Sequence, residues 1–298
     1  MHTLLSEVVI SFQELVCAVV SYDWRPANSR KLEEHLLRVF DLKTGRRRIE
    51  FPVLWDEGGD RVCFSSDSSR IFVGCYEAHG LACYDARSGN EVWRRKDLKS
   101  IQQVAASPRE DLVFCGRETG ASHIIEGGTG KTVMNPRGAK EAWFSPFDDS
   151  ALLDCGGNRD LEIHRPLGTR VGKFVRASFG VVHVAFSKEC VALAEANQPL
   201  RAIGLRDFVQ VWQLPTDDAH TCEALAYSQK RNAFVVAREK SSKRQFQDIN
   251  AATGTGSSPR GNVVAGRGAF FGDADYFVDA QGTTYSVASG KKLKEAIF

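Results

Sequence analysis

The histidines and cysteines are the residues of this chain whose chemistry could support a metal site or a nucleophile. The seven histidines include no H-x-H or H-E-x-x-H pair, and the eight cysteines include no C-x-x-C pair. Zinc sites are typically built from such closely spaced ligands. We therefore predict no metal ligand and no catalytic residue. His183, on a predicted innermost strand, could contribute to a metal site assembled from several repeats, but we interpret it as an isolated core histidine.

Most cysteines fall at positions where the chain needs a small apolar side chain. Cys17, Cys75, Cys115 and Cys155 all stand in segments predicted to be the second strand of a repeat. A buried thiol behaves as a small hydrophobic group, and none of these is visibly paired with a base. Eight cysteines in 298 residues also do not form a disulfide framework. We expect unreactive thiols in a reducing compartment, the cytoplasm.

Two glycine-rich segments have part of a phosphate-binding pattern. The segment Gly128–Thr132 matches the end of a P-loop, but the required first glycine is replaced by Ile125. A P-loop also needs a strand–loop–helix context, whereas here we predict strand, turn and strand. Gly254–Gly256 starts a dinucleotide-binding fingerprint that fails at Pro259. We interpret both segments as turns and predict no bound cofactor.

Charge and composition exclude several classes of protein. The chain has 39 Lys and Arg against 37 Asp and Glu, and 43% of its residues are hydrophobic. This balance argues against a nucleic-acid binder, and the apolar content suffices for a sizeable core. No apolar run reaches the roughly 18 residues of a membrane span. Residues 1–22 contain Glu7 and Glu14 but no Lys or Arg, so we interpret them as strands and not as a targeting signal.

A serine-containing pattern recurs along the chain: apolar residues, an aromatic or small residue, a serine and then a turn. The clearest copies are Val62–Asp67 and Ala142–Pro146. The marker positions are 11, 65, 107, 145, 187, 228 and 272, the last being a degenerate copy with glycine. The spacings between them are 54, 42, 38, 42, 41 and 44 residues. A period near forty residues indicates a repeat architecture with seven copies.

A second marker keeps the same period. It is a strand that ends in an acidic or polar residue, followed by two residues and then by Thr-Gly or Ser-Gly. Copies begin at positions 41, 85, 126, 250 and 286. Glycine supplies a positive φ, and the Asp and Ser or Thr side chains can bond to the turn backbone. We therefore predict a hairpin turn at each copy.

The two markers divide each repeat into four short strands. In the second repeat these are Arg61–Ser65, Arg70–Tyr76, Leu81–Asp85 and Asn90–Arg95. One four-stranded sheet cannot bury both of its faces, whereas sheets stacked around an axis can. We predict an all-β fold, a seven-bladed β-propeller of four-stranded antiparallel blades in one domain, 1–298. The expected blades are 1–51, 52–98, 99–138, 139–178, 179–219, 220–262 and 263–298.

Two segments resemble known propeller repeats. The stretch Tyr84–Trp93 is similar to the Asp-x-x-Thr-Gly-x-x-x-Trp element of quinoprotein repeats, and Phe64–Asp67 resembles the first hairpin of a WD repeat. The chain thus resembles the WD-repeat and quinoprotein-like (PQQ-like) propeller superfamily along its whole length. It has no Gly-His pair, and its Trp55-Asp56 pair falls between blades. The resemblance therefore implies the fold without the buried hydrogen-bond tetrad of WD repeats.

The loops between second and third strands share one face with the loops between blades, and they differ from blade to blade. We predict the binding surface on this loop face, because variable loops on a rigid scaffold carry function. Its long first loop holds Trp, Tyr and Arg, which are enriched in interface hot spots, although Trp24 could instead pack beneath its own loop. The segment Lys240–Arg244 is expected to form an inter-strand loop that meets an acidic partner. The predicted partner-binding residues are Tyr22, Trp24, Arg25, Trp55, Asp56, Arg117, Glu118, Arg159, Asp160, Lys240 and Lys243.

Two functions remain open. The favoured one is a non-enzymatic module that binds one protein partner, as a scaffold or as an inhibitor such as an immunity protein against a toxin. For this function we expect a monomer that binds no nucleic acid and no membrane. The alternative is implied by the resemblance to quinoprotein dehydrogenases and to propeller lyases and hydrolases. It is an enzyme or ligand-binding propeller with a metal or quinone at the central axis.

Overall fold

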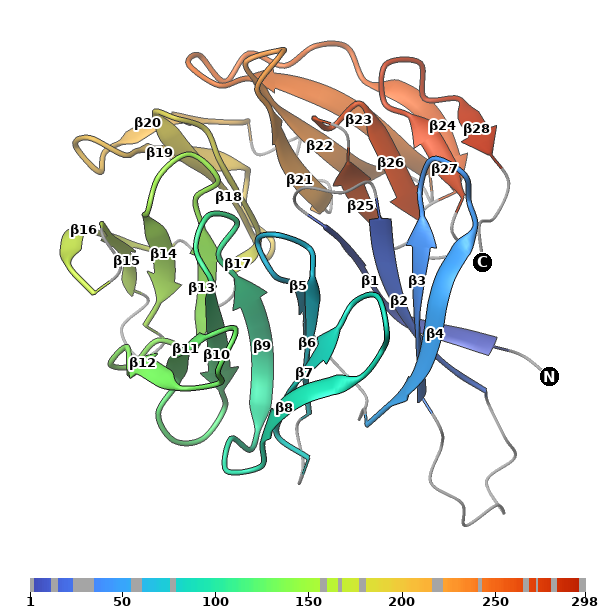
Figure 1. Cartoon of the computed structure of the whole chain (residues 1–298). Helices are drawn as coiled ribbons and strands as arrows, with labels where there is room; N and C mark the ends of the chain where they lie inside the picture. The colour runs from blue at the N-terminus through green and yellow to red at the C-terminus, as the bar shows by residue number, and fades with distance from the viewer. Residues whose placement is uncertain are drawn as a thin grey trace. The chain divides into compact units, whose positions relative to one another are not determined.

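A computed structural model describes residues 3–11, 16–23, 35–54, 61–75, 79–155, 160–165, 168–176, 181–215, 222–240, 243–264, 268–271, 273–279 and 283–294 (Figure 1). These segments consist of strands and turns, with no helix among them. Consecutive strands form seven four-stranded antiparallel sheets. The predicted fold class, an all-β seven-bladed β-propeller, is confirmed.

Each sheet, or blade, contains four strands that follow one another in the chain. Blades 1 and 2 are β1 (Thr3–Ile10), β2 (Val16–Asp23), β3 (His35–Asp41) and β4 (Arg47–Val53), then β5 (Val62–Phe64), β6 (Arg70–Gly74), β7 (Leu81–Asp85) and β8 (Glu91–Arg95). Blades 3 and 4 are β9 (Ile101–Ala106), β10 (Leu112–Arg117), β11 (His123–Glu126) and β12 (Thr132–Met134), then β13 (Glu141–Phe144), β14 (Ala151–Asp154), β15 (Asp160–His164) and β16 (Arg170–Val175).

The last three blades follow the same order. Blade 5 is β17 (Val181–Phe186), β18 (Cys190–Glu195), β19 (Arg201–Gly204) and β20 (Gln210–Gln213). Blades 6 and 7 are β21 (Cys222–Ser228), β22 (Ala233–Lys240), β23 (Lys243–Asn250) and β24 (Arg260–Val264), then β25 (Gly268–Phe271), β26 (Tyr276–Asp279), β27 (Thr284–Ser286) and β28 (Lys292–Lys294). Blades 1 and 7 are each built from their own four strands, as predicted.

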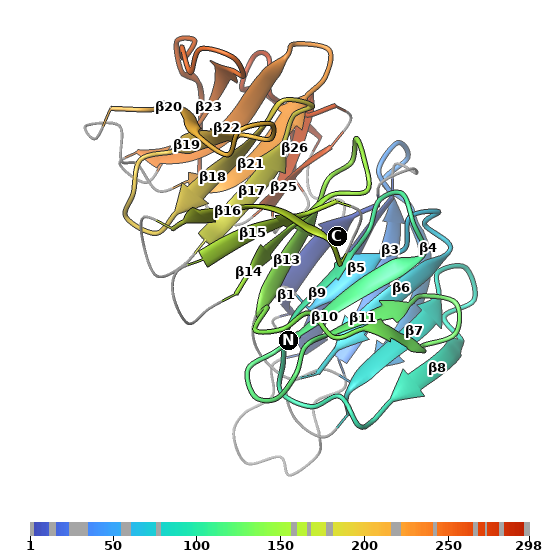
Figure 2. The same ribbon diagram turned by 90° about the vertical axis from the view of Figure 1, so that its left-hand side faces the viewer.

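The chain divides into two compact units. The first unit is Met1–Gly156 with Pro166–Gly168, and the second is Gly157–Arg165 with Thr169–Phe298. Within the first unit β1 contacts β5, and β5 contacts β9; within the second, β17 contacts β21, and β21 contacts β25 (Figure 2). First strands of neighbouring blades therefore line up next to one another inside each unit. The single domain 1–298 stays a prediction.

Burial decreases from the inner strands of a blade to its outer strand. All six residues of β18 are buried, whereas the outer strand β4 is largely exposed. Inner strands are covered on both faces by the adjacent sheets, so they tolerate near-continuous apolar runs. Cys17 and Cys115 lie in second strands as predicted, while Cys75 and Cys155 come one residue after theirs.

The marker serines cap the turn after each first strand. Ser145 Oγ accepts hydrogen bonds from the backbone N–H groups of Phe147 and Asp148 at 3.1 and 3.4 Å. Ser187 Oγ accepts one from Cys190 N at 2.9 Å. Both serines are buried, and so are the other four marker serines, Ser11, Ser65, Ser107 and Ser228. A buried turn needs these donors satisfied, which explains why serine recurs with the repeat.

The second marker forms the turn between third and fourth strands. Asp85 Oδ1 accepts hydrogen bonds from the backbone N and the Oγ of Ser88 at 2.7 and 2.8 Å. Gly89 has a φ of 72°, and its N–H donates to the Asp85 carbonyl at 2.9 Å. The P-loop-like segment Gly128–Thr132 forms this same turn between β11 and β12. Its glycines therefore serve the hairpin, as interpreted from the sequence.

Tryptophans of two outer strands dock under the third-to-fourth-strand turn of the next blade. Trp93 Nε1 donates to the Gly127 carbonyl at 2.8 Å, and a Cβ added at Gly130 would lie 2.9 Å from the Trp93 ring. Trp212 Nε1 donates to the Ala251 carbonyl at 2.8 Å in the same way. The turn therefore requires glycine for two reasons: the backbone is left-handed, and an indole ring lies where a Cβ would be.

Replacing Gly130 by Ala is expected to lower the free energy of unfolding by about 2–5 kcal/mol. A left-handed φ costs alanine roughly 1–2 kcal/mol, and crowding against the Trp93 ring adds about 1–3 kcal/mol. Gly138→Ala is the matched control, because Gly138 has a φ of 77° and its added Cβ would come no closer than 3.4 Å to Cys155 O. Urea unfolding followed by circular dichroism should give a smaller loss for the control; equal losses would contradict the ring contact.

Candidate functional site

The structure describes only part of the loop face predicted from the sequence. Trp24, Arg25, Trp55, Asp56 and Arg159 lie outside the described residues. Tyr22 and Lys240 are placed as strand residues of β2 and β22, and nothing is described of their side chains. Arg117, Glu118, Asp160 and Lys243 are described in full.

Arg117 and Glu118 lie together where β10 ends. Arg117 Nε donates to the Lys99 carbonyl at 2.7 Å. Lys140 Nζ donates to the carbonyls of Arg117 and Glu118 at 3.0 and 2.8 Å. These bonds hold the backbone of the loop in place and leave the Glu118 side chain exposed. Arg117 therefore uses part of its hydrogen-bonding capacity within the protein, on the segment that precedes β9.

Asp160 and Lys243 belong to the second unit. Asp160 begins β15 and forms an ion pair with Lys173 Nζ of β16 at 2.6 Å. Lys243 begins β23, pairs with Lys240 of β22 and is exposed. No contact joins Asp160 to Lys243 in the part of the unit that the structure describes.

The prediction that Lys240–Arg244 forms a loop is wrong for three of its residues. Lys240, Lys243 and Arg244 are strand residues of a tight hairpin between β22 and β23. Arg244 is completely buried, and its Nε bonds to Glu223 Oε2 at 2.6 Å. Alternation along the strand turns Lys243 outward and Arg244 inward. Arg244 is therefore a core residue and not part of a surface for an acidic partner.

The described part of the chain offers no group of three or more His, Cys, Asp or Glu side chains that could hold a metal ion. His183 is half-buried on β17, the first strand of its blade. Burial raises the pKa of the Cys17, Cys83, Cys115 and Cys222 thiols to about 12. These thiols are therefore protonated at neutral pH.

No helix in the described segments has the length and apolarity to cross a membrane.

Two hollows lie at equivalent places of different blades, beside the turns and not beside the predicted loops. The blade-2 hollow is lined by Val16, Val39, Arg48, Phe64, Asp67, Ser68, Ser69, Ala86 and Arg87. The blade-5 groove is lined by Arg165, Val171, Lys188, Glu189, Leu205, Arg206 and Phe208. Arg87 and Arg206 occupy the same position of their turns. In blade 2, Ala86 N donates to Ser69 O at 2.8 Å, and in blade 5, Leu205 N donates to Glu189 O at 2.8 Å.

The blade-5 groove, with a volume of about 670 Å³, combines apolar and cationic side chains. Lys188 and Arg206 are exposed, and neither forms an ion pair with any residue that the structure describes. Val171 is 42% exposed although apolar. With Arg165 and Glu189, the groove carries three cationic side chains against one carboxylate. Such a surface complements a segment that is both acidic and apolar.

Phe208 occupies the position of the turn glycine in blade 5. Its N–H donates to Gly204 O at 3.1 Å, the bond that Gly89 makes to Asp85 in blade 2. Its φ is 58°, and no other aromatic residue of the described chain has a φ in the left-handed region. A Cβ added at Gly172 would lie 2.3 Å from the ring, so Phe208 rests directly on the Gly172 backbone. A bulky residue in this conformation is strained, and such strain is often found at functional sites.

The blade-5 groove was not predicted from the sequence, because all turns were interpreted as structural. The missed residues of this groove are Lys188, Arg206 and Phe208, and those of the blade-2 hollow are Arg48, Ser68 and Arg87. One signal was present in the sequence. The second marker is absent from blade 5, where the turn reads Gly204-Leu205-Arg206-Asp207-Phe208. A lost turn glycine in an otherwise regular repeat marks a position under a different requirement.

Comparison with solved structures supports the same architecture. A chain of the crystal structure of a mitotic checkpoint complex has a TM-score of 0.69 and 13% identity, over 97% of this chain and 89% of that chain. The computationally designed Ika8 protein also has a TM-score of 0.69, with 16% identity over 100% and 88%. The U3-55K protein has a TM-score of 0.67 and 10% identity over 93% and 88%.

This chain has the seven-bladed β-propeller fold. No protein-family model and no curated protein sequence matches it. At these identities the shared property is the fold, because one fold hosts many unrelated functions. The function of this propeller must therefore be argued from its own side chains.

Proposed function

We propose that this propeller is a non-enzymatic module that binds a protein partner. The observation that carries the proposal is Phe208, an aromatic residue held in a left-handed turn conformation beside Lys188 and Arg206. The repeat itself would be served better by glycine at this position. Phe208 is strained in this conformation, and its aromatic ring lines the blade-5 groove.

The chemistry of the groove defines the partner that it fits. Phe208 and Val171 offer apolar surface that an aliphatic or aromatic side chain can cover. Lys188 and Arg206 can pair with carboxylates of the partner that flank this apolar side chain, and their charge raises the rate at which the partner associates. We infer a partner segment with one apolar anchor flanked by Asp or Glu. The groove is open, as is typical of surfaces that bind protein segments and not small cofactors.

The loop face remains part of the proposal as a second contact surface. Glu118 and Lys243 are exposed on described loop or strand ends, and the hydrogen bonds of Lys140 hold the Glu118 backbone in place. A scaffold would use the two surfaces for two partners, whereas an inhibitor, such as an immunity protein, would suppress the activity of one. We propose a monomer in the cytoplasm, and the free state of all eight cysteines fits that reducing compartment.

Phe208→Gly is expected to weaken partner binding strongly without destabilising the protein. Glycine relieves a conformational penalty of roughly 1–2 kcal/mol and loses the packing of the ring on Gly172. We expect the free energy of unfolding to change by less than about 1 kcal/mol, while affinity falls about ten-fold or more, as for an aromatic hot spot. The measurement is affinity capture from host lysate with tagged full chain, followed by titration of the captured protein.

Three further variants identify the surface. Lys188→Glu with Arg206→Glu should reduce binding as strongly as Phe208→Gly, and Lys131→Glu in the blade-3 turn should not. Reversal of Arg25, Arg117 and Lys243 tests the loop face in the same titration. If only the loop variant loses the partner, the groove is not the binding site. If no variant changes capture, or nothing is captured, the proposed function is wrong in this form.

A further inference from the structure

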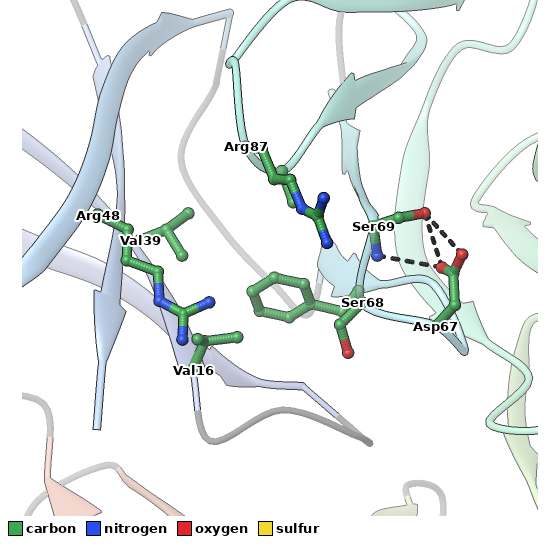
Figure 3. A pocket seen from close by; sticks show the side chains of 9 residues that line it. Val16, Val39, Arg48, Asp67, Ser68, Ser69 and Arg87 are labelled. Atoms are coloured by element: carbon green, nitrogen blue, oxygen red, sulfur yellow. Dashed lines mark hydrogen bonds between the residues drawn. The ribbon is translucent and has the colours of Figure 1, made fainter. Parts of the chain in front are cut away.

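The blade-2 hollow is a small polar pocket in the first unit, separate from the groove discussed above. Its volume is about 160 Å³. That is the space of roughly five water molecules at about 30 Å³ each, well below the 300 Å³ or more of a typical drug-sized site. It lies between strands of blade 1 and the turns of blade 2 (Figure 3). The pocket therefore suits a small group and not a nucleotide or quinone.

Ser68 is the least expected residue of this pocket. It has a φ of 61°, in the left-handed region, and is only 6% exposed. Its Oγ is buried without a hydrogen-bond partner. A buried hydroxyl without a partner lowers the stability of the fold by roughly 1–3 kcal/mol. A non-glycine residue in a left-handed conformation lowers it by a similar amount. Both costs fall on one residue at the wall of a pocket, which points to a ligand that the hydroxyl would bind.

Two guanidinium groups reach toward the same space. In Figure 3, Arg48 extends from β4 and Arg87 from the turn after β7, each toward the gap between them. Arg48 Nη2 is held by Asp41 Oδ2 at 2.8 Å, which fixes its guanidinium. The Arg87 guanidinium makes no hydrogen bond within the residues that the structure describes. Arginine presents several donors in a planar fork that matches a carboxylate.

The nearby carboxylates accept hydrogen bonds from residues of their own turns. Asp67 accepts hydrogen bonds from Ser65 Oγ at 2.6 Å and from Ser69 Oγ at 2.8 Å, and it turns away from the arginines in Figure 3. Burial raises its pKa, but these bonds outweigh burial and lower the pKa to about 2. Asp85 bonds to Ser88 as described above, and Asp41 bonds to Thr44 N at 2.9 Å. These acids weaken the positive field of the pocket but do not fill it.

The remaining lining is apolar. Val16, Val39, Phe64 and Ala86 are all buried residues of the surrounding strands and turn. An inorganic anion would gain nothing from such a wall, whereas an aliphatic group would bury surface against it at about 25 cal/mol per Å². We propose that the blade-2 hollow binds a carboxylate attached to a short aliphatic group, with Arg87, Arg48 and Ser68 as donors.

Two molecules present this chemistry. One is a free branched short-chain carboxylic acid, and the other is the C-terminal residue of a peptide that ends in Val or Leu. The pocket recognises the shared carboxylate and aliphatic group in both. Arg48 is already shared with Asp41, and the pocket is small, so a dissociation constant on the order of 1 mM is expected for the free acid.

The test is isothermal titration of the full chain with 3-methylbutanoate and with its neutral amide at constant ionic strength. The acid should bind saturably and at least about ten-fold tighter than the amide. A short peptide that ends in Leu is compared in its free-acid and C-terminally amidated forms. A free-acid peptide that binds tighter than 3-methylbutanoate identifies a peptide C-terminus as the source; equal affinity identifies the small acid.

Variants decide whether the pocket itself is responsible. Arg87→Gln should weaken acid binding about ten-fold or more, whereas Lys131→Gln, at an exposed position of the blade-3 turn outside both hollows, should leave it unchanged. Ser68→Gly removes the hydroxyl and suits the left-handed backbone, so it should weaken binding in a chain that remains folded. The proposal is overturned by equal binding of acid and amide, by no saturable binding, or by equal effects of Arg87→Gln and Lys131→Gln. Inorganic phosphate binding as tightly as the acid would also overturn it.

Discussion

Replacing Arg244 by Ala is expected to lower the free energy of unfolding by about 3–5 kcal/mol. Arg244 has no exposed surface, and its Nε bonds to Glu223 Oε2 at 2.6 Å. The substitution leaves the carboxylate of Glu223 in a site where its side chain is only 10% exposed. A buried carboxylate that loses an ion-pair partner is costly because water cannot replace that partner.

Packing adds to the electrostatic loss at Arg244. The guanidinium carbon lies 4.4 Å from the centroid of the Phe277 ring, a cation–π contact between blades 6 and 7. Nη1 and Nη2 are buried without hydrogen-bond partners, so the wild-type side chain already carries a desolvation penalty. Removing both charges at once is therefore expected to cost much less than removing Arg244 alone.

The measurement is urea unfolding of Arg244→Ala, Arg244→Met and Arg244→Met with Glu223→Met. The double variant should recover most of the stability lost by the single ones, since apolar replacement of a buried pair is often neutral or stabilising. Arg109→Ala is the control: Arg109 pairs with Asp149 at 3.6 Å, and both side chains are about half exposed. A surface pair contributes about 0–1 kcal/mol. If Arg244→Ala lost no more than Arg109→Ala, the buried pair would not stabilise the fold.

Trp212→Ala is expected to lower the free energy of unfolding by about 3–5 kcal/mol, as large-to-small changes of aromatic core residues do. Trp212 is buried, and its ring centroid lies 5.9 Å from that of Phe234. A Cβ added at Gly254 would come within 2.8 Å of the indole, so the blade-6 turn sits directly on the ring. Removing the indole opens a cavity between the outer strand of blade 5 and blade 6.

Trp212→Phe separates the ring from its hydrogen bond. Phenylalanine keeps an aromatic ring under the turn but cannot donate to the Ala251 carbonyl, now bonded at 2.8 Å. We expect a loss of about 1–3 kcal/mol, because the Ala251 carbonyl then keeps only the weak thiol donor of Cys190, whose Sγ lies 3.5 Å away. Trp93→Ala is the matched comparison, because Trp93 makes the equivalent bond to Gly127 but is only half-buried. Circular dichroism during urea unfolding should rank Trp212→Ala above Trp93→Ala; the reverse order would contradict the role of burial.

The fold was predictable because its markers act locally. Ser145 and Ser187 each bond to backbone groups within three residues, and Asp85 bonds to Ser88 and Gly89 in the same turn. A hydrogen bond of such short sequence separation needs the same residue at the same place in every copy. The period of about forty residues in the sequence is therefore a direct record of the repeated turns.

The candidate sites were not predictable in the same way. Arg244 was assigned to a surface loop, but its exposure depends on which face of β23 meets Phe277 of the next blade. The blade-2 hollow joins Arg48 to Arg87, which are far apart in the sequence and meet only because two sheets pack together. Periodicity describes one blade at a time and says nothing about which side chains of neighbouring blades come into contact.

The sequence by itself determined the seven four-stranded blades and the turns between their strands, because these follow from local hydrogen bonds and from the need of each sheet to cover both faces. Only the tertiary structure decided that Arg244 is buried, that Phe208 lies on Gly172, and that Ser68 faces a pocket beside two arginines. These properties arise from contacts between blades. Contacts of that kind depend on the packing of distant residues, which no single repeat encodes.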